Sequence, residues 1–62
     1  MLKVGDKVYV TADKKERKGT VAYENDFFTI FQFQHYKEGF QKVDINNGMV
    51  KVDVISWYKE WH

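Results

Sequence analysis

The strongest strand signal in this sequence is the stretch Phe27-Phe28-Thr29-Ile30-Phe31-Gln32-Phe33-Gln34. Aromatic and β-branched residues fill it, and no apolar stripe at helical spacing runs through it, so it predicts a β-strand. Alternation along a strand puts Phe28 and Ile30 on one face, and Phe27, Phe31 and Phe33 on the other. Periodicity leaves open which of the two sets faces the core, because both are apolar and a bulge would mix them.

A first strand is expected ahead of it. From Lys3 to Thr11, side chains on one side are the valines 4, 8 and 10, and those on the other are Lys7, Tyr9 and Thr11. A turn or bulge at Gly5-Asp6 interrupts this pattern. The alternation predicts a half-buried strand.

Charge dominates the segment that follows. Asp13 to Lys18 has no apolar anchor and precedes Gly19, which predicts a charged loop. Thr20 to Glu24 resumes β-branched and aromatic character, and Asn25-Asp26 supplies turn residues. We therefore predict a second strand over residues 20–24, followed by a tight turn.

The dipeptide Asn47-Gly48 is the strongest hairpin signal in the chain, because both residues tolerate positive φ in a type I′ turn. Counting outward from it pairs residues of matching chemistry: Ile45 with Val50, Val43 with Val52, Asp44 with Lys51, and Lys42 with Asp53. The sequence therefore predicts a final hairpin over residues 42–53. The segment Ser56-Trp57-Tyr58-Lys59-Glu60-Trp61-His62 fits either one helical turn or a last short strand.

Composition describes a small folded domain. The 62 residues are 44% hydrophobic and 18% aromatic, include no cysteine, and carry a formal charge of +1. These values suit one domain over residues 1–62, stabilised by apolar packing without disulfides. With no membrane-spanning apolar stretch and no signal-peptide pattern at the start, we expect a cytoplasmic protein and no membrane partner.

Five short strands joined by turns predict an all-β fold: a small five-stranded barrel with a short C-terminal turn or helical tail. The opening Val4-Gly5-Asp6-Lys7-Val8-Tyr9-Val10, followed by Gly19-Thr20-Val21, resembles SH3-like small barrels, including those of the KOW type. That resemblance covers about a third of the chain and implies an SH3-like barrel. Such barrels bind peptides, RNA, DNA or other subunits, so the resemblance does not select a ligand.

The stretch from Phe28 to Ile45 is similar to short uncharacterised proteins of phages and mobile elements in low-GC Gram-positive bacteria. Many of those proteins carry serine or cysteine where this chain has Gly39. The resemblance implies a phage or mobile-element origin, and with it a bacterial host cytoplasm.

Catalytic chemistry has little support in the sequence. Ser56 and His62 lie near the chain end, His35 has Tyr36 and Glu38 as its notable neighbours, and cysteine is absent. These residues form no convincing nucleophile–base pair or metal-ligand set. We expect a non-catalytic protein with no metal and no cofactor.

Two binding functions are expected instead. The first is protein–protein interaction, with a host or phage protein or in a homo-oligomer, through five aromatic anchors: Tyr36, Phe40, Trp57, Tyr58 and Trp61. The alternative is nucleic-acid binding, in which cations contact phosphates and aromatics stack on bases. Its expected residues are Lys14, Lys15, Arg17, Lys18, Tyr9 and Tyr23.

Overall fold

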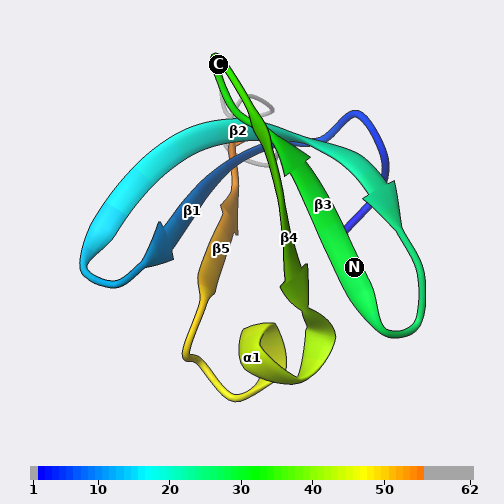
Figure 1. The fold of residues 1–62 in the computed structure, drawn as a ribbon, viewed down its shortest axis with the longest axis vertical. Helices are drawn as coiled ribbons and strands as arrows, with labels where there is room; N and C mark the ends of the chain where they lie inside the picture. Colours follow the sequence, from blue (N-terminus) through cyan, green and yellow to red (C-terminus); the bar gives the residue numbers. More distant parts are fainter. Residues whose placement is uncertain (1, 56–62) are drawn as a thin grey trace.

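A computed structural model describes residues 2–55 of the chain. Its strands are β1 (Lys7–Ala12), β2 (Lys15–Glu24), β3 (Phe28–Gln32), β4 (Lys37–Gln41) and β5 (Lys51–Val54) (Figure 1). One short helix, α1 (Lys42–Asn46), lies between β4 and β5. The predicted C-terminal turn or strand falls outside the described residues.

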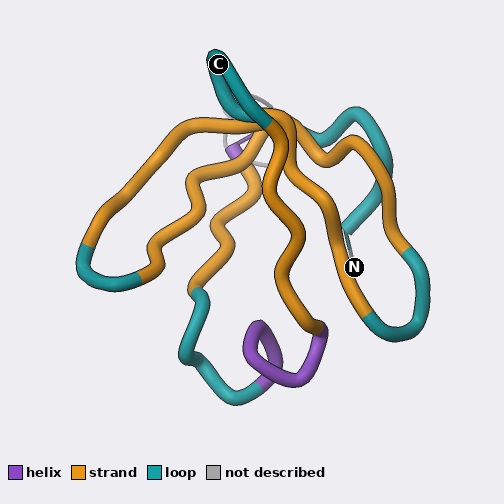
Figure 2. The backbone as a smooth tube through the Cα atoms, in the orientation of Figure 1, coloured by secondary structure: helices purple, strands orange, loops and turns teal. Residues whose placement is uncertain are grey.

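The strands form one antiparallel sheet in the order β4-β3-β2-β1-β5. The expectation of an all-β fold with five strands is confirmed. Figure 2 shows the sheet curving around the centre of the molecule, with the helical turn at one end. The helix in the described residues is too short to cross a membrane.

One face of the sheet, here the inner face, carries the core. Its buried hydrophobic side chains are Val8, Val10, Val21, Phe31, Phe33, Val50 and Val54. Residues directly opposite each other in antiparallel strands project to the same side. Val8 and Val10 of β1 lie opposite Val54 and Val52 of β5, so these four side chains share the inner face. The predicted alternation of the first strand is confirmed over β1.

The ambiguous third strand is resolved by burial. Phe31 and Phe33 belong to the core, while Phe28 and Ile30 are half-buried on the opposite, outer face. Phe27 precedes the strand in the β2–β3 turn and is 77% exposed. The strand is apolar on both faces because one face packs into the core and the other carries hydrophobic side chains at the surface.

The prediction of a charged loop over Asp13 to Lys18 is wrong. Only Asp13 and Lys14 form the turn, with φ of 52° and 65°, and β2 already begins at Lys15. The β1–β2 pairing continues to Ala12 opposite Lys15. Backbone hydrogen bonding in a two-residue hairpin thus extends a strand through residues that charge alone assigns to a loop.

The predicted hairpin over residues 42–53 is also wrong. Lys42–Asn46 is helical, and β5 pairs with β1 instead of with residues 42–46. Gly48 does adopt a positive φ of 86°, so the turn signal is correct although the element before it is not. Pairing with β1 gains core burial for Val54, which a local hairpin does not offer.

A register shift between Val21 and Tyr23 interrupts the β2–β3 pairing. Val21 lies opposite Phe31, and Tyr23, not Ala22, lies opposite Ile30. The extra residue forms a bulge, a feature that bends a strand and increases its twist. Beyond it, the Glu24 carboxylate is paired with the Lys42 ammonium, which ties the end of β2 to the start of α1.

Candidate functional site

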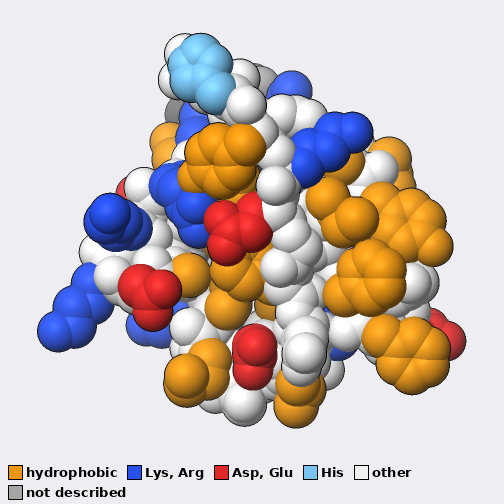
Figure 3. Space-filling view, viewed as in Figure 1, with side chains coloured by type: hydrophobic (Ala, Val, Ile, Leu, Met, Phe, Trp, Pro, Cys, Tyr) orange, Lys and Arg blue, Asp and Glu red, His pale blue; other side chains and the backbone are white. Residues whose placement is uncertain are grey.

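Four hydrophobic residues, two exposed and two half-buried, form one surface over the end of β2, the β2–β3 turn and β3. This aromatic patch consists of Tyr23, Phe27, Phe28 and Ile30. The rings of Tyr23 and Phe28 are 5.8 Å apart, and Tyr23 lies opposite Ile30 in the sheet. Figure 3 shows hydrophobic side chains gathered on this side of the molecule.

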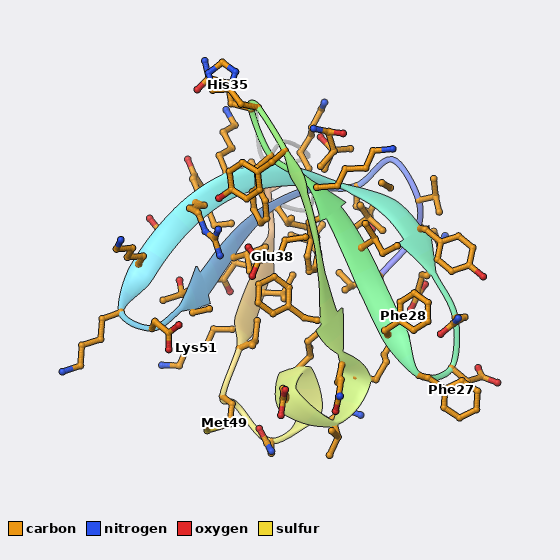
Figure 4. The ribbon with its side chains drawn as sticks, in the orientation of Figure 1. Phe27, Phe28, His35, Glu38, Met49 and Lys51 are labelled. Carbon is orange, nitrogen blue, oxygen red and sulfur yellow. The ribbon has the colours of Figure 1, made fainter. Side chains whose placement is uncertain are left out.

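Hydrogen bonds to the backbone of the β2–β3 turn fix the position of Phe27. The side-chain oxygen of Asn25 accepts hydrogen bonds from the backbone N–H groups of Phe27 and Phe28, at 2.8 and 2.9 Å. The carbonyl of Phe27 accepts another from the N–H of Lys42, also at 2.8 Å. The phenyl ring therefore projects from an ordered turn (Figure 4), and binding through it costs little ordering of the backbone.

A shallow groove continues the patch toward α1. Phe27 and Phe28 line one side, and Lys42 and Val43 of α1 line the other. Val43 is 59% exposed, so an apolar side chain of the helix extends the hydrophobic surface. The patch and the groove together offer a partner one apolar surface with an aromatic centre.

A second cluster joins non-adjacent strands on the inner face. The guanidinium of Arg17 lies 4.5 Å from the ring centroid of Phe33 and 5.7 Å from that of Tyr36. It donates hydrogen bonds to the Tyr36 hydroxyl and to the Glu38 carboxylate, the latter at 3.0 Å. The hydrogen bond to Tyr36 chiefly raises the pKa of Arg17, with Glu38 adding to the effect and burial opposing it. The arginine serves as a link between β2 and β4.

The residues predicted as protein-binding anchors do not form one surface in the described part of the chain. Phe40 packs on the core ring of Phe31, at 5.9 Å between centroids, and is half-buried. Tyr36 is 44% exposed but is engaged with Arg17. The other three anchors, Trp57, Tyr58 and Trp61, lie outside the described residues.

The residues predicted for nucleic-acid binding are divided between the two faces of the sheet. Lys15 and Arg17 project inward, because Arg17 lies opposite the buried Val10. Lys18 projects outward beside Tyr9, which is 38% exposed. The other two predicted residues are apart from this pair: Lys14 sits in the hairpin turn, and Tyr23 belongs to the aromatic patch.

Sequence reasoning placed the binding anchors elsewhere and left open which face of residues 27–34 is exposed, so it did not select the aromatic patch. The signal is present in the run from Phe27 to Gln34, because an apolar outer face remains once the inner face fills the core. Sequence alone does not identify which face points inward, so it does not identify which apolar side chains remain at the surface. The contribution of Val43 had no signal, since that residue was expected inside a hairpin.

Within residues 2–55, no three histidine, cysteine, aspartate or glutamate side chains lie close enough together to hold a metal ion. The fold and the aromatic patch describe a small all-β domain with an exposed apolar surface. No protein-family model, curated protein or solved structure matches this chain.

Proposed function

We propose that this chain is a non-catalytic protein-interaction module built on an SH3-like barrel. The observation that carries the proposal is the aromatic patch, in which Phe27 and Tyr23 are 77% and 47% exposed beside two half-buried hydrophobic side chains. Hydrogen bonds to the Asn25 side chain order the turn that carries Phe27. Exposed apolar surface of this kind is typical of protein-binding sites, where aromatic residues supply much of the binding energy. The partner we propose is another protein of a bacterial host or its phage, met in the host cytoplasm.

The strand order supports the barrel part of the proposal. A small barrel of this kind bends one antiparallel sheet around a single core. The order β4-β3-β2-β1-β5 places all five strands in one sheet, and the bulge in β2 supplies a bend. Phe28 and Ile30 place the patch on the outer face of the sheet, away from the buried residues of the inner face.

The test compares variants of exposed apolar residues. Phe27→Ser removes the most exposed ring of the patch, and Met49→Ser removes a side chain of similar exposure, 72%, that lies outside it. Both changes are at the surface, so each is expected to alter stability by no more than about 0.5 kcal/mol. The bait is the full chain, used to capture proteins from bacterial lysate with nuclease treatment and a high-salt wash.

We expect wild type and Met49→Ser to retain the same protein, and Phe27→Ser to lose it. Titration calorimetry with the purified partner should then show at least a tenfold weaker Kd for Phe27→Ser, as for a hot-spot residue. Equal affinity of the two variants would remove the aromatic patch from the interface. A homodimer in light scattering that Phe27→Ser dissociates would replace the proposed partner with a second copy of the chain.

A further inference from the structure

A second hollow, separate from the aromatic patch, has both polar and apolar residues in its lining. It is lined by the polar residues Lys7, Lys18, Thr20, Gln32 and Gln34, together with Gly19, Phe33 and Ile55. Its polar side chains are two ammonium groups, one hydroxyl and two carboxamides, with no carboxylate among the lining residues. The Gln32 amide is already engaged, because it donates to the carbonyls of Phe33 and Tyr36 at 2.7 and 3.1 Å. The two ammonium groups are therefore the donors that suit an anionic ligand.

Neither ammonium group of the hollow forms an ion pair within the described residues, and Asp53, a carboxylate of the same outer face, lies opposite Tyr9. The two ion pairs within residues 2–55 join Arg17 to Glu38 and Lys42 to Glu24. Neither pair includes a residue that lines the hollow. The ammonium of Lys7 instead contacts a neutral group, the hydroxyl of Thr20, at 3.3 Å. Lys37 lies opposite Gln32 and adds a third cation to the same face.

These residues lie in register across the sheet. Lys7, Thr20, Gln32 and Lys37 occupy successive opposing positions on β1, β2, β3 and β4. With strands about 4.8 Å apart, this row spans about 14 Å. A row of this length has room for only a few nucleotides, which is near the lower end, about four nucleotides, of the site sizes of small single-strand-binding folds.

An aromatic ring lies beside the row. Tyr9 is directly opposite Lys18 on the outer face and is 38% exposed. We propose that this face binds single-stranded nucleic acid: Lys7, Lys18 and Lys37 contact phosphates, and Tyr9 stacks on a base. Stacking on a protein ring needs an unpaired base, which favours a single strand over a duplex. The proposal is independent of the protein-binding function, because it uses other residues.

The test measures fluorescence anisotropy of labelled twelve-nucleotide oligo(dT) and oligo(rU) with the full chain. Three phosphate contacts predict that affinity falls about 20-fold between 50 and 200 mM salt. The triple variant Lys7→Gln, Lys18→Gln, Lys37→Gln is expected to remove most of this salt dependence. Tyr9→Leu is expected to weaken binding at least about fivefold at any salt concentration.

Lys14→Gln is the matched control, because it removes one exposed cation from the hairpin turn, outside the hollow. It should change affinity less than about twofold, and circular dichroism should show every variant folded. The proposal is overturned if wild type does not bind, if the triple variant binds as wild type does, or if a duplex of the same length binds more tightly. Phe27→Ser is expected to bind the oligonucleotides normally, so this result and the protein-binding result can be separated.

Discussion

The guanidinium of Arg17 lies 4.5 Å from the ring centroid of Phe33, a core residue that is only 4% exposed. Arg17 belongs to β2, and the Glu38 carboxylate that it contacts belongs to β4. Since β3 separates these strands in the sheet, the arginine spans the inner face and covers the edge of the core.

Arg17→Met is expected to destabilise the domain by about 1–2 kcal/mol, because it removes a cation–π contact and a partly exposed ion pair. For a domain of this size, Tm should fall by roughly 5–15 °C. Thermal and urea unfolding followed by circular dichroism measure this loss. Lys15→Met, on the same face but exposed, is the control and should change stability by less than about 0.5 kcal/mol. Equal effects of the two variants would contradict the role of Arg17.

The contribution of Arg17 should not depend on pH near neutrality. Its pKa is raised in the folded protein, so the stabilisation is complete below the unfolded pKa and is lost only as pH rises through the folded value. Both values lie in strong alkali. The stability difference between wild type and Arg17→Met should therefore be constant from about pH 6 to about pH 9. Urea titrations at several pH values test this, and a difference that shrinks across that range would contradict it.

Thr29→Val should stabilise the domain. The Thr29 side chain is fully buried, and its hydroxyl has no hydrogen-bond partner within the described residues. Valine has nearly the same shape and removes the desolvated hydroxyl, so a gain of about 1 kcal/mol is expected. Thermal unfolding should show a higher Tm, while Thr11→Val on the outer face should have little effect. A lower Tm for Thr29→Val would mean that the hydroxyl is satisfied in solution.

Gly19→Ala should destabilise the domain by about 1–3 kcal/mol through overpacking. A Cβ at Gly19 would lie 2.9 Å from a ring carbon of Phe33 and 3.0 Å from the Gln32 carbonyl oxygen. Gly39→Ala is the control, because its Cβ would lie 3.6 Å from Ile30, an ordinary contact distance. Urea unfolding should separate the two variants. If Gly39→Ala proved as costly as Gly19→Ala, the close approach to Phe33 would not be the cause.

The double variant Asp13→Asn, Lys14→Gly should stabilise the β1–β2 hairpin. Both native residues adopt positive φ, which favours asparagine and glycine in a two-residue turn. We expect a gain of about 0.5–1 kcal/mol, measured by urea unfolding. Lys14→Ala is the control and should change stability by less than about 0.5 kcal/mol, because lysine and alanine carry the same Cβ and are equally strained at positive φ. A loss in the double variant would show that the native side chains stabilise the turn.

Local patterns were sufficient to predict β1, β3 and the position of the last turn. The alternation that places Val8 and Val10 on one side of β1 is a local pattern, because it requires only that one side faces water and the other the core. The structure confirms this alternation. Gly48 marks a change of direction that depends on its own backbone conformation. Features decided by φ preference or by strict alternation are readable from a single sequence.

Non-local pairing accounts for the predictions that failed. The sequence around Asn47-Gly48 fits a hairpin well, yet β5 pairs with β1, more than forty residues earlier in the chain. The hydrogen bond from the Val50 N–H to the Asp44 carbonyl, 3.0 Å, and the Lys42–Glu24 ion pair stabilise the alternative local structure. The choice depends on which strand buries more apolar surface, and a local pattern does not carry that information. For the same reason, the sequence did not show which face of residues 27–34 carries the aromatic patch.

The bulge in β2 contains one extra residue, Ala22, whose removal would leave the pairing on either side of it intact. Val21 and Glu24 lie opposite Phe31 and Thr29 on the inner face, and Tyr23 lies opposite Ile30 on the outer one. A β2 without Ala22 would keep each of these side chains on its present side, because regular alternation through Val21, Tyr23 and Glu24 gives the same order. Only the bend would be lost. Deletion of this one residue would therefore leave every neighbouring side chain facing as it does now while flattening the sheet, so that curvature and surface chemistry are able to evolve separately at this position.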